Sequence, residues 1–518
     1  MRVPGSILLS LALFCVRHAA ASTPLPSLLD ATIADLAELL ESGAVTSVDL
    51  VTAYFSRIEE VNDELHAVLE INAKALEAAK ASDDERVSAM HSGASLGPLH
   101  GIPILVKDNI ATFDNNNTAG SVCMLGSKVK SEATMITKLR RAGAIILGKT
   151  NMSEWAGARS NGENSTTIGW SAVGGECRAA YVVDQSPSGS SGGSASAVSV
   201  GLAPVALGTE TDGSIISPSE HSNLVGIKPT MGLTSRHGVI PITHRQDTIG
   251  PLCKTVSDCA FVLSVLAGKD VSNDNYTSAQ PFVTPPDYMK SLNLSGMAGK
   301  RLGVPWNLLD KDWDEFMVSS SQLEFIVRTF NQSIKIIEQA GATVVAANYS
   351  FLGATQKDFQ TWANSNGTIT FQADMLQSIN DYLDDLKVRA PGITTIEDLV
   401  NCTKHDPRER YPDVDIGLWD RMIKNNYSAG SETTWRAYQN GIKLAGEGAI
   451  LSSLRDYDLD ALILPSFAAY DLPAKIGSPV VTVPMGVFDD SVDEMWDPMH
   501  ARRFNAVSLI IKTHHDCY

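Results

Sequence analysis

Two loops rich in glycine and serine, separated by a run of small apolar residues, constrain this chain more than any other stretch. The first loop surrounds Ser190, the second surrounds Ser214, and the apolar run lies between them at 195–207. A single loop of this composition would indicate little, because glycine and serine are common in turns and linkers. Two loops that flank an apolar run favour a site, since glycine lets backbone N–H groups approach a ligand and serine hydroxyls can act as nucleophiles.

A lysine follows a short apolar run far upstream of these loops. Residues 102–106 read IPILV, which predicts a strand buried on both faces, and Lys107 comes directly after it. An isolated lysine is usually a surface charge, but burial at the end of such a strand would lower its pKa and favour the neutral amine. One lysine and two serines from separate loops can form a Ser-Ser-Lys hydrolase site.

Five motifs in a fixed order resemble those of the amidase signature family. They are GIPILVKDN (101–109), GSSGGS (189–194), GTETDGSI (208–215), VGIKPT (225–230) and QDTIGP (246–251). The resemblance extends over about residues 28–485. It implies an α/β/α layered fold with a large mixed central sheet covered by helices. It also implies hydrolysis of carboxylic amides through an acyl-serine intermediate, with no cofactor and no metal.

The resemblance implies roles for individual residues. Lys107 matches the family's base, Ser190 its bridging serine and Ser214 its acylated nucleophile. The oxyanion hole is expected from four consecutive backbone N–H groups, those of Thr211, Asp212, Gly213 and Ser214. Asp212 stands where many relatives have glycine, and TETDGS looks like the branch that includes peptide amidases and fungal amidases. A carboxylate at this position would repel an anionic substrate.

Three other patterns offer alternative sites. Residues 143–150 match the P-loop pattern, but the residues between its glycines form a β-branched apolar run that favours a strand. Residues 189–193 match the G-x-S-x-G elbow with Ser191 as nucleophile, although the preceding residues read as a turn where an elbow needs a strand. A Ser-His-Asp site would need a histidine, and scattered histidines are more often surface or core residues; the candidates are His221, His237 and His244.

The composition is that of a globular protein. The chain has 518 residues, of which 44% are hydrophobic and 19% are charged. No low-complexity linker interrupts the middle, so we expect one amidase signature domain over 22–485. The formal net charge of −18 argues against nucleic acid or an anionic membrane as a partner, since both attract positive surfaces. We expect a small-molecule or peptide amide as the substrate.

The first 21 residues have the pattern of a secretory signal peptide. Arg2 precedes an apolar run at 7–16, and small residues end at Ala21. The run is too short to span a bilayer comfortably, so cleavage and secretion are expected, with a signal anchor as the alternative. Six cysteines remain after cleavage, an even number that suits some disulfides of undetermined pairing. Recurring Asn-x-Ser/Thr sequons predict a glycoprotein; they include Asn116, Asn275, Asn293, Asn331, Asn348, Asn366, Asn401 and Asn426.

Helix and strand patterns alternate along the chain, as in a layered α/β protein. Helices are expected at 32–40, 46–60, 73–89, 134–142 and 322–340, with a helical cover over the site at 351–445. Strands are expected at 102–106, 144–147, 301–305, 344–346, 459–465 and 480–484. The tail at 486–518 is atypical, because it shows no match to the strand and terminal helix that the family places there. We expect the loss of that strand to expose apolar surface and a sheet edge.

Three classes of function are compatible with these observations. The first is a secreted amidase that releases ammonia or an amine. The second is an ammonia-supplying component of a larger enzyme, like the one in glutamyl-tRNA amidotransferase, against which the signal peptide argues. The third is a catalytically impaired or non-catalytic binding protein on the same fold, which the atypical tail would favour.

Overall fold

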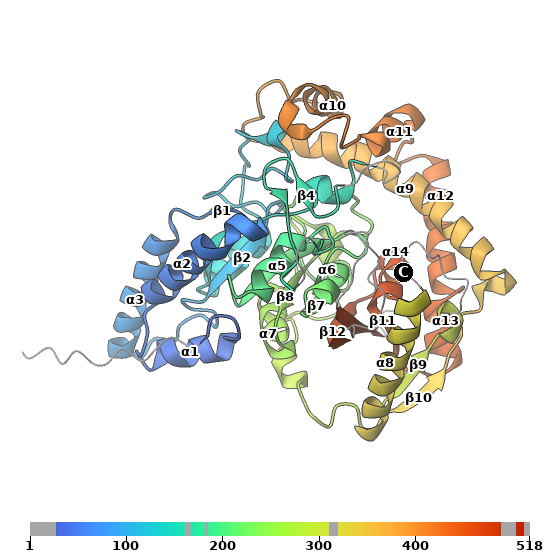
Figure 1. The fold of residues 1–518 in the computed structure, drawn as a ribbon, viewed down its shortest axis with the longest axis horizontal. Helices are drawn as coiled ribbons and strands as arrows, with labels where there is room; N and C mark the ends of the chain where they lie inside the picture. Colours follow the sequence, from blue (N-terminus) through green and yellow to red (C-terminus); the bar gives the residue numbers. More distant parts are fainter. Residues whose placement is uncertain (1–26, 161–166, 182–184, 310–319, 488–503, 512–518) are drawn as a thin grey trace, which may run out of the picture.

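The computed structural model describes residues 27–160, 167–181, 185–309, 320–487 and 504–511. The expected signal peptide and most of the atypical tail lie outside these ranges. An eleven-stranded mixed sheet forms the centre of the molecule (Figure 1). In spatial order its strands are β1 (Val68–Ile71), β3 (Ile145–Thr150), β2 (Pro103–Lys107), β6 (Val205–Glu210), β8 (Thr248–Cys253), β7 (Val225–Lys228), β12 (Val480–Val487), β13 (Phe504–Ile511), β11 (Ala461–Pro465), β9 (Arg301–Val304) and β10 (Thr343–Ala346).

Strand direction changes within the sheet. β2 is parallel to both β3 and β6, whereas β6 is antiparallel to β8. The parallel strands β2 and β6 therefore both run toward the edge where the lysine and the second serine loop lie. β4 (Trp170–Ser171) and β5 (Gly175–Glu176) pair separately as a short hairpin.

Helices precede, connect and follow these strands. They are α1 (Ile33–Glu41), α2 (Ser47–Leu65), α3 (Ala75–Ser92), α4 (Thr134–Arg141), α5 (Gly192–Ser199), α6 (Ile216–His221), α7 (Val256–Leu266), α8 (Ser320–Gln339), α9 (Gln356–Asp385), α10 (Ile396–His405), α11 (Gly417–Asn425), α12 (Glu432–Gly446), α13 (Ile450–Asp456) and α14 (Asp471–Lys475). The expected starts of α1 and α2 are confirmed: Thr32 with Asp35, and Thr46 with Asp49, form capping boxes that satisfy exposed backbone N–H groups.

Helices cover both faces of the sheet. The side chain of Leu252 in β8 and that of Ser191, the residue before α5, both approach the same side of Gly208 in β6. A Cβ added to Gly208 would lie 2.7 Å from Leu252 Cδ1 and 2.8 Å from Ser191 Oγ. Leu252 therefore points to the face of the sheet on which α5 begins. Side chains alternate along a strand, so Cys253 points to the opposite face, where it is bonded to Cys259 of α7. This arrangement confirms the expected α/β/α layers.

The expected helical cover at 351–445 is also confirmed. α9, α10, α11 and α12 form an arc along the top and right of the view in Figure 1. The ring of Trp419 in α11 packs edge-on against Trp155, with centroids 5.6 Å apart. A disulfide between Cys123 and Cys402 joins α10 to the segment that follows β2. The cover is thus packed and covalently attached next to the segment around Trp155.

The expectation for the tail is wrong at one point. Residues 504–511 form β13, which pairs antiparallel with β12 on one side and β11 on the other. The tail therefore fills a position inside the sheet, where the sequence analysis expects a missing strand. Extended backbone pairs through N–H and C=O groups that every non-proline residue has, so no family motif is needed.

Three further observations bear on the sequence-based expectations. Among the described cysteines, Cys123–Cys402 and Cys253–Cys259 are disulfides and Cys177 is a buried thiol. None of the described helices has the length and apolar character needed to cross a bilayer. Residues 145–150, inside the P-loop match, form the buried strand β3, as the apolar run predicted.

Candidate active site

Lys107 is the last residue of β2 and is completely buried, with 0% of its surface exposed. Its Nζ lies 2.7 Å from Ser190 Oγ and 3.0 Å from Ser191 Oγ. The same nitrogen lies 2.9 Å from Thr209 Oγ1 and 3.2 Å from Thr209 O. The structure thus brings the predicted base into direct contact with the predicted bridging serine, 83 residues away in the sequence.

Burial controls the charge of this lysine. Desolvation lowers the pKa of Lys107 to about 7, and the carboxylates of Glu210 and Asp247 oppose the shift because they favour the ammonium form. A large fraction of the side chain is therefore a neutral amine near neutral pH. A neutral amine has a lone pair and can accept a proton.

The Ser190 loop is held by backbone contacts. The Gly189–Ser190 peptide is cis, and the Ser153 N–H donates to Ser190 O at 3.0 Å. The described residues before it, 185–189, form no strand, and α5 begins at Gly192. A nucleophile elbow needs a strand directly before the serine, and these residues do not form one, as the turn-like sequence indicated. Ser191 Oγ instead donates to Thr209 O at 3.1 Å inside the lysine network.

Ser214 lies in the loop between β6 and α6, and 8% of its surface is exposed. The Ser191 N–H donates to Ser214 O at 3.2 Å, so the two serine loops are in contact. Glu210 Oε2 accepts the N–H groups of Ile215 at 2.7 Å and Ile216 at 2.9 Å. Glu210 therefore fixes the backbone directly after Ser214, a role that the sequence analysis missed.

The four predicted oxyanion donors are all in this loop, with different surroundings. Gly213 has φ +79°, and a Cβ there would lie 3.0 Å from the Tyr470 ring, which explains the glycine. The Asp212 side chain is exposed and hydrogen-bonds the Asp471 carboxyl, which is ion-paired with Lys475.

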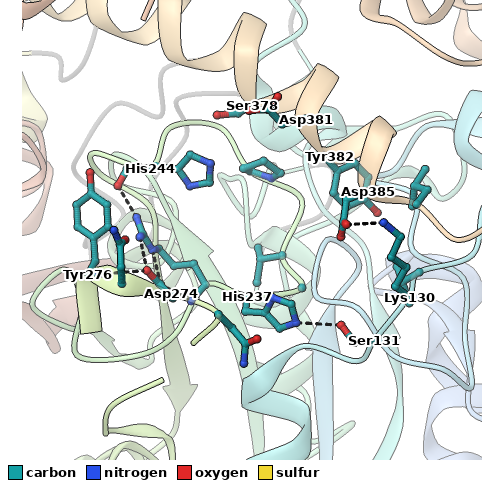
Figure 2. A pocket seen from close by; sticks show the side chains of 18 residues that line it. Lys130, Ser131, His237, His244, Asp274, Tyr276, Ser378, Asp381, Tyr382 and Asp385 are labelled. Atoms are coloured by element: carbon teal, nitrogen blue, oxygen red, sulfur yellow. Dashed lines mark hydrogen bonds and ion pairs between the residues drawn. The ribbon is translucent and has the colours of Figure 1, made fainter. Parts of the chain in front are cut away.

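The three candidate histidines have other surroundings. His237 Nε2 hydrogen-bonds Ser131 Oγ at 2.9 Å, and His237 and His244 line a surface pocket below α9 (Figure 2). His221 is buried in α6. The base that hydrogen-bonds Ser190 is a lysine. Within the described ranges, no group of three His, Cys, Asp or Glu side chains is arranged to hold a metal ion.

A buried ionic cluster joins the cover to the Ser190 side of the site. Arg159 Nη1 lies 2.9 Å from Glu154 Oε1 and 2.8 Å from Glu409 Oε2, and all three side chains are fully buried. Glu154 follows Ser153, whose backbone holds Ser190. Removing Arg159 would leave two buried carboxyl groups without their cation, which is strongly destabilising. No local pattern signals this cluster, because Glu409 lies 250 residues from Arg159 in the sequence.

Comparison with known proteins agrees with this geometry. The family model described as Amidase matches residues 49–491. A protein of Arthroderma benhamiae whose name describes it as an amidase is 43% identical, over 90% of this chain and 78% of its own length. The crystal structure of a peptide amidase from Stenotrophomonas maltophilia is 32% identical and superposes with a TM-score of 0.79 over 94% of both chains.

The glutamyl-tRNA(Gln) amidotransferase relatives are less similar over a shorter region. The matching polypeptide of the Thermobifida fusca amidotransferase is 35% identical, over 61% of this chain and 59% of its own length. The structure of its Thermotoga maritima counterpart is 21% identical with a TM-score of 0.64, which shows the shared fold. The match of the family model over most of the chain is the stronger finding. This chain belongs to the amidase signature family and is a hydrolase that acts on amides.

Proposed function

We propose that this protein cleaves the C–N bond of carboxylic amides through a Ser-Ser-Lys triad. Neutral Lys107 accepts the Ser190 proton while the Ser190 oxygen accepts the Ser214 proton. Ser214 Oγ then attacks the carbonyl carbon, and the relay delivers a proton to the leaving nitrogen as the C–N bond breaks. Water hydrolyses the resulting ester by the same route and restores Ser214. The observation that supports this most directly is the 2.7 Å hydrogen bond from Lys107 Nζ to Ser190 Oγ.

The oxyanion of the tetrahedral intermediate would lie against the backbone of the Ser214 loop. We propose the backbone N–H groups of Thr211, Asp212, Gly213 and Ser214 as its donors. In other hydrolases the loss of one such donor costs about 3–4 kcal/mol of transition-state stabilisation. Backbone donors already held in place need no reorganisation during the reaction, which favours this assignment.

The substrate class follows from the relatives. One structural relative is a peptide amidase, so we propose that this enzyme removes ammonia from C-terminal peptide amides or from simple acyl amides. The structure does not support the expected repulsion of anionic substrates by Asp212, because its carboxyl is hydrogen-bonded to Asp471 and so carries a proton, and Lys475 balances the charge of Asp471. Ammonia release from a panel of acyl amides, aryl amides and C-terminal peptide amides tests the proposed substrate class. Release from aryl amides alone would contradict it.

We also propose that the protein is secreted and glycosylated. Six of the sequon asparagines have exposed side chains: Asn275, Asn293, Asn331, Asn348, Asn401 and Asn426. Asn116 is less available, because its Nδ2 donates to Glu70 Oε2 at 3.0 Å. After expression in a secreting eukaryotic host, we expect a mature N-terminus near Ala21 and glycans on several exposed sequons. Mass spectrometry of the intact protein and its peptides measures both, and an unglycosylated cytosolic product that retains Met1 would contradict the proposal.

A further inference from the structure

A small cavity lies behind Thr209, on the path from the molecular surface to Lys107. Its volume is about 20 Å³, and its polar lining includes Asn109, Thr209, Thr211 and Asp247. A site for one water needs about 10–15 Å³ and at least two polar partners. The cavity meets both requirements.

The side chain of Asn109 is only partly satisfied by its neighbours. Asn109 is 3% exposed, and its Nδ2 donates to Thr209 Oγ1 at 3.0 Å. Its Oδ1 is buried and has no hydrogen-bond partner among the described atoms. A buried carbonyl oxygen of this kind normally has a partner, and in a polar cavity that partner is a water.

The hydroxyl group of Thr209 gives a second, independent indication. Its oxygen lies 2.9 Å from Lys107 Nζ and 3.0 Å from Asn109 Nδ2, and both of these nitrogens can donate. A hydroxyl oxygen accepts two hydrogen bonds and donates one. With both acceptor positions in use, the Thr209 proton needs an acceptor of its own. A water in the cavity could accept this proton and donate to Asn109 Oδ1.

Counting hydrogen-bond donors and acceptors in the same way gives the orientation of the Lys107 amine. A neutral amine has two N–H donors and one lone pair. Ser191 Oγ donates to Thr209 O, so toward Lys107 it acts as an acceptor. The second N–H points to Thr209, whose Oγ1 at 2.9 Å and carbonyl O at 3.2 Å share it as acceptors. The lone pair then faces Ser190 Oγ, at 2.7 Å, the one neighbour that can donate to it.

The cavity lies next to a surface pocket on the side away from the serine loops. It shares Arg236, Val239, Pro241 and His244 with a surface pocket of about 520 Å³. Figure 2 shows this pocket, with His244 in the open space between the loops below and Ser378, Asp381 and Tyr382 of α9 above. These four residues are thus all that the two linings have in common, and they form the boundary between the small cavity and the surface pocket.

We propose that the cavity binds one water molecule that hydrogen-bonds Asn109 and Thr209, and that this network makes Thr209 the acceptor that directs the lone pair of Lys107 at Ser190. The inference deepens the proposed Ser-Ser-Lys function and rests on it. Asn109 and Thr209 are positioning residues in this account, because they act through Lys107. The charged groups that influence the pKa of Lys107 are Glu210 at the end of β6 and Asp247 beside β8. Substitutions of Asn109 or Thr209 leave both of these carboxyl groups in the protein.

Thr209→Val tests the network, because valine keeps the shape and removes the hydroxyl. We expect kcat to fall by roughly 10–100-fold, less than the about 10²–10⁴-fold that a general base contributes in full, because Lys107 remains present but is poorly oriented; KM should change little. Loss of an acceptor for the ammonium form lowers the pKa of Lys107, so the acidic limb of the kcat/KM profile should move to lower pH. Thr209→Ser keeps the hydroxyl and should recover most of kcat and the original limb.

A matched control separates positioning from stability. Thr234 is also buried, and its hydroxyl donates to Ile249 O at 2.9 Å, away from Lys107. Thr234→Val should lower the melting temperature and leave the pH limb in place. Asn109→Leu provides a second variant of the network if Thr209→Val does not fold. It should lower kcat and remove the ordered water from a high-resolution crystal structure.

Two results would overturn the inference. One is a folded Thr209→Val enzyme with the wild-type pH limb and kcat. The other is a crystal structure of the wild-type protein in which another side chain satisfies Asn109 Oδ1 and the cavity is filled. A fluorophosphonate probe separates this failure from failure of the proposed function. If the probe labels Ser214 and the Thr209 variants keep the wild-type kcat and pH limb, only the water network is rejected. If the probe labels a different residue, the Ser-Ser-Lys assignment is rejected.

Discussion

Replacement of Ser214 by alanine is expected to lower kcat/KM for amide hydrolysis by at least about 10³-fold, since losing the nucleophile of a hydrolase leaves only binding and oxyanion stabilisation. The fold should be retained, because the backbone around Ser214 is held by Glu210 and by the Ser191 N–H, neither of which uses the Ser214 hydroxyl. Steady-state kinetics and circular dichroism on the same preparation measure the two effects.

The control is the same exchange three residues further along. Ser217 lies in α6, and its hydroxyl contacts that of Ser188 at 2.8 Å. Ser217→Ala should keep activity within about threefold of the wild type, as is usual for a substitution outside the catalytic groups. Ser214→Ala enzyme that folds normally and keeps more than a few per cent of activity would show that Ser214 is not the nucleophile.

Replacement of Lys107 by methionine is expected to lower kcat/KM by about 10²–10⁴-fold, the usual contribution of a general base. Only the neutral amine accepts a proton. With its pKa lowered to about 7, the active fraction rises as pH increases through neutrality. The wild-type kcat/KM should therefore increase through about pH 7 and level off in the mildly alkaline range. The residual activity of Lys107→Met should lack this limb.

A histidine would titrate near about 6.5, so the position of the limb cannot by itself identify the group. The comparison of variants can. His237→Gln and His244→Gln change the two histidines of the outer pocket and should leave the limb where it is. A limb that persists in Lys107→Met and disappears in either histidine variant would contradict the assignment of the base.

The family motifs identify from the sequence alone three residues whose segments the fold brings together. Lys107, Ser190 and Ser214 come from three separate motifs, and the structure brings Lys107 to Ser190 and the Ser190 loop to the Ser214 loop. The starts of α1 and α2 were readable because a capping box is a local device, complete within four residues. The apolar run before Lys107 likewise identified a buried strand.

Features that depend on distant pairing could not be read in the same way. Thr209 contacts Lys107 across 102 residues and Arg159 contacts Glu409 across 250, and neither residue has a local pattern that identifies its partner. Hydrogen-bond accounting around Asn109 requires the positions of all its neighbours. The β13 strand was missed for a related reason, because strand order in a sheet is a property of the whole fold.

The position of β13 has a consequence for how the protein is made. The strands on one side of it extend from β1 to β12, and those on the other side are β11, β9 and β10. Of the eleven strands it leaves the ribosome last, and it joins two groups that meet nowhere else in the sheet order. Until residues 504–511 emerge, the nascent chain carries two unpaired inner edges, at β11 and β12, which are open to wrong pairing. We expect the sheet to close only after synthesis of this segment, so that correct pairing of its two halves depends on the last described residues of the chain.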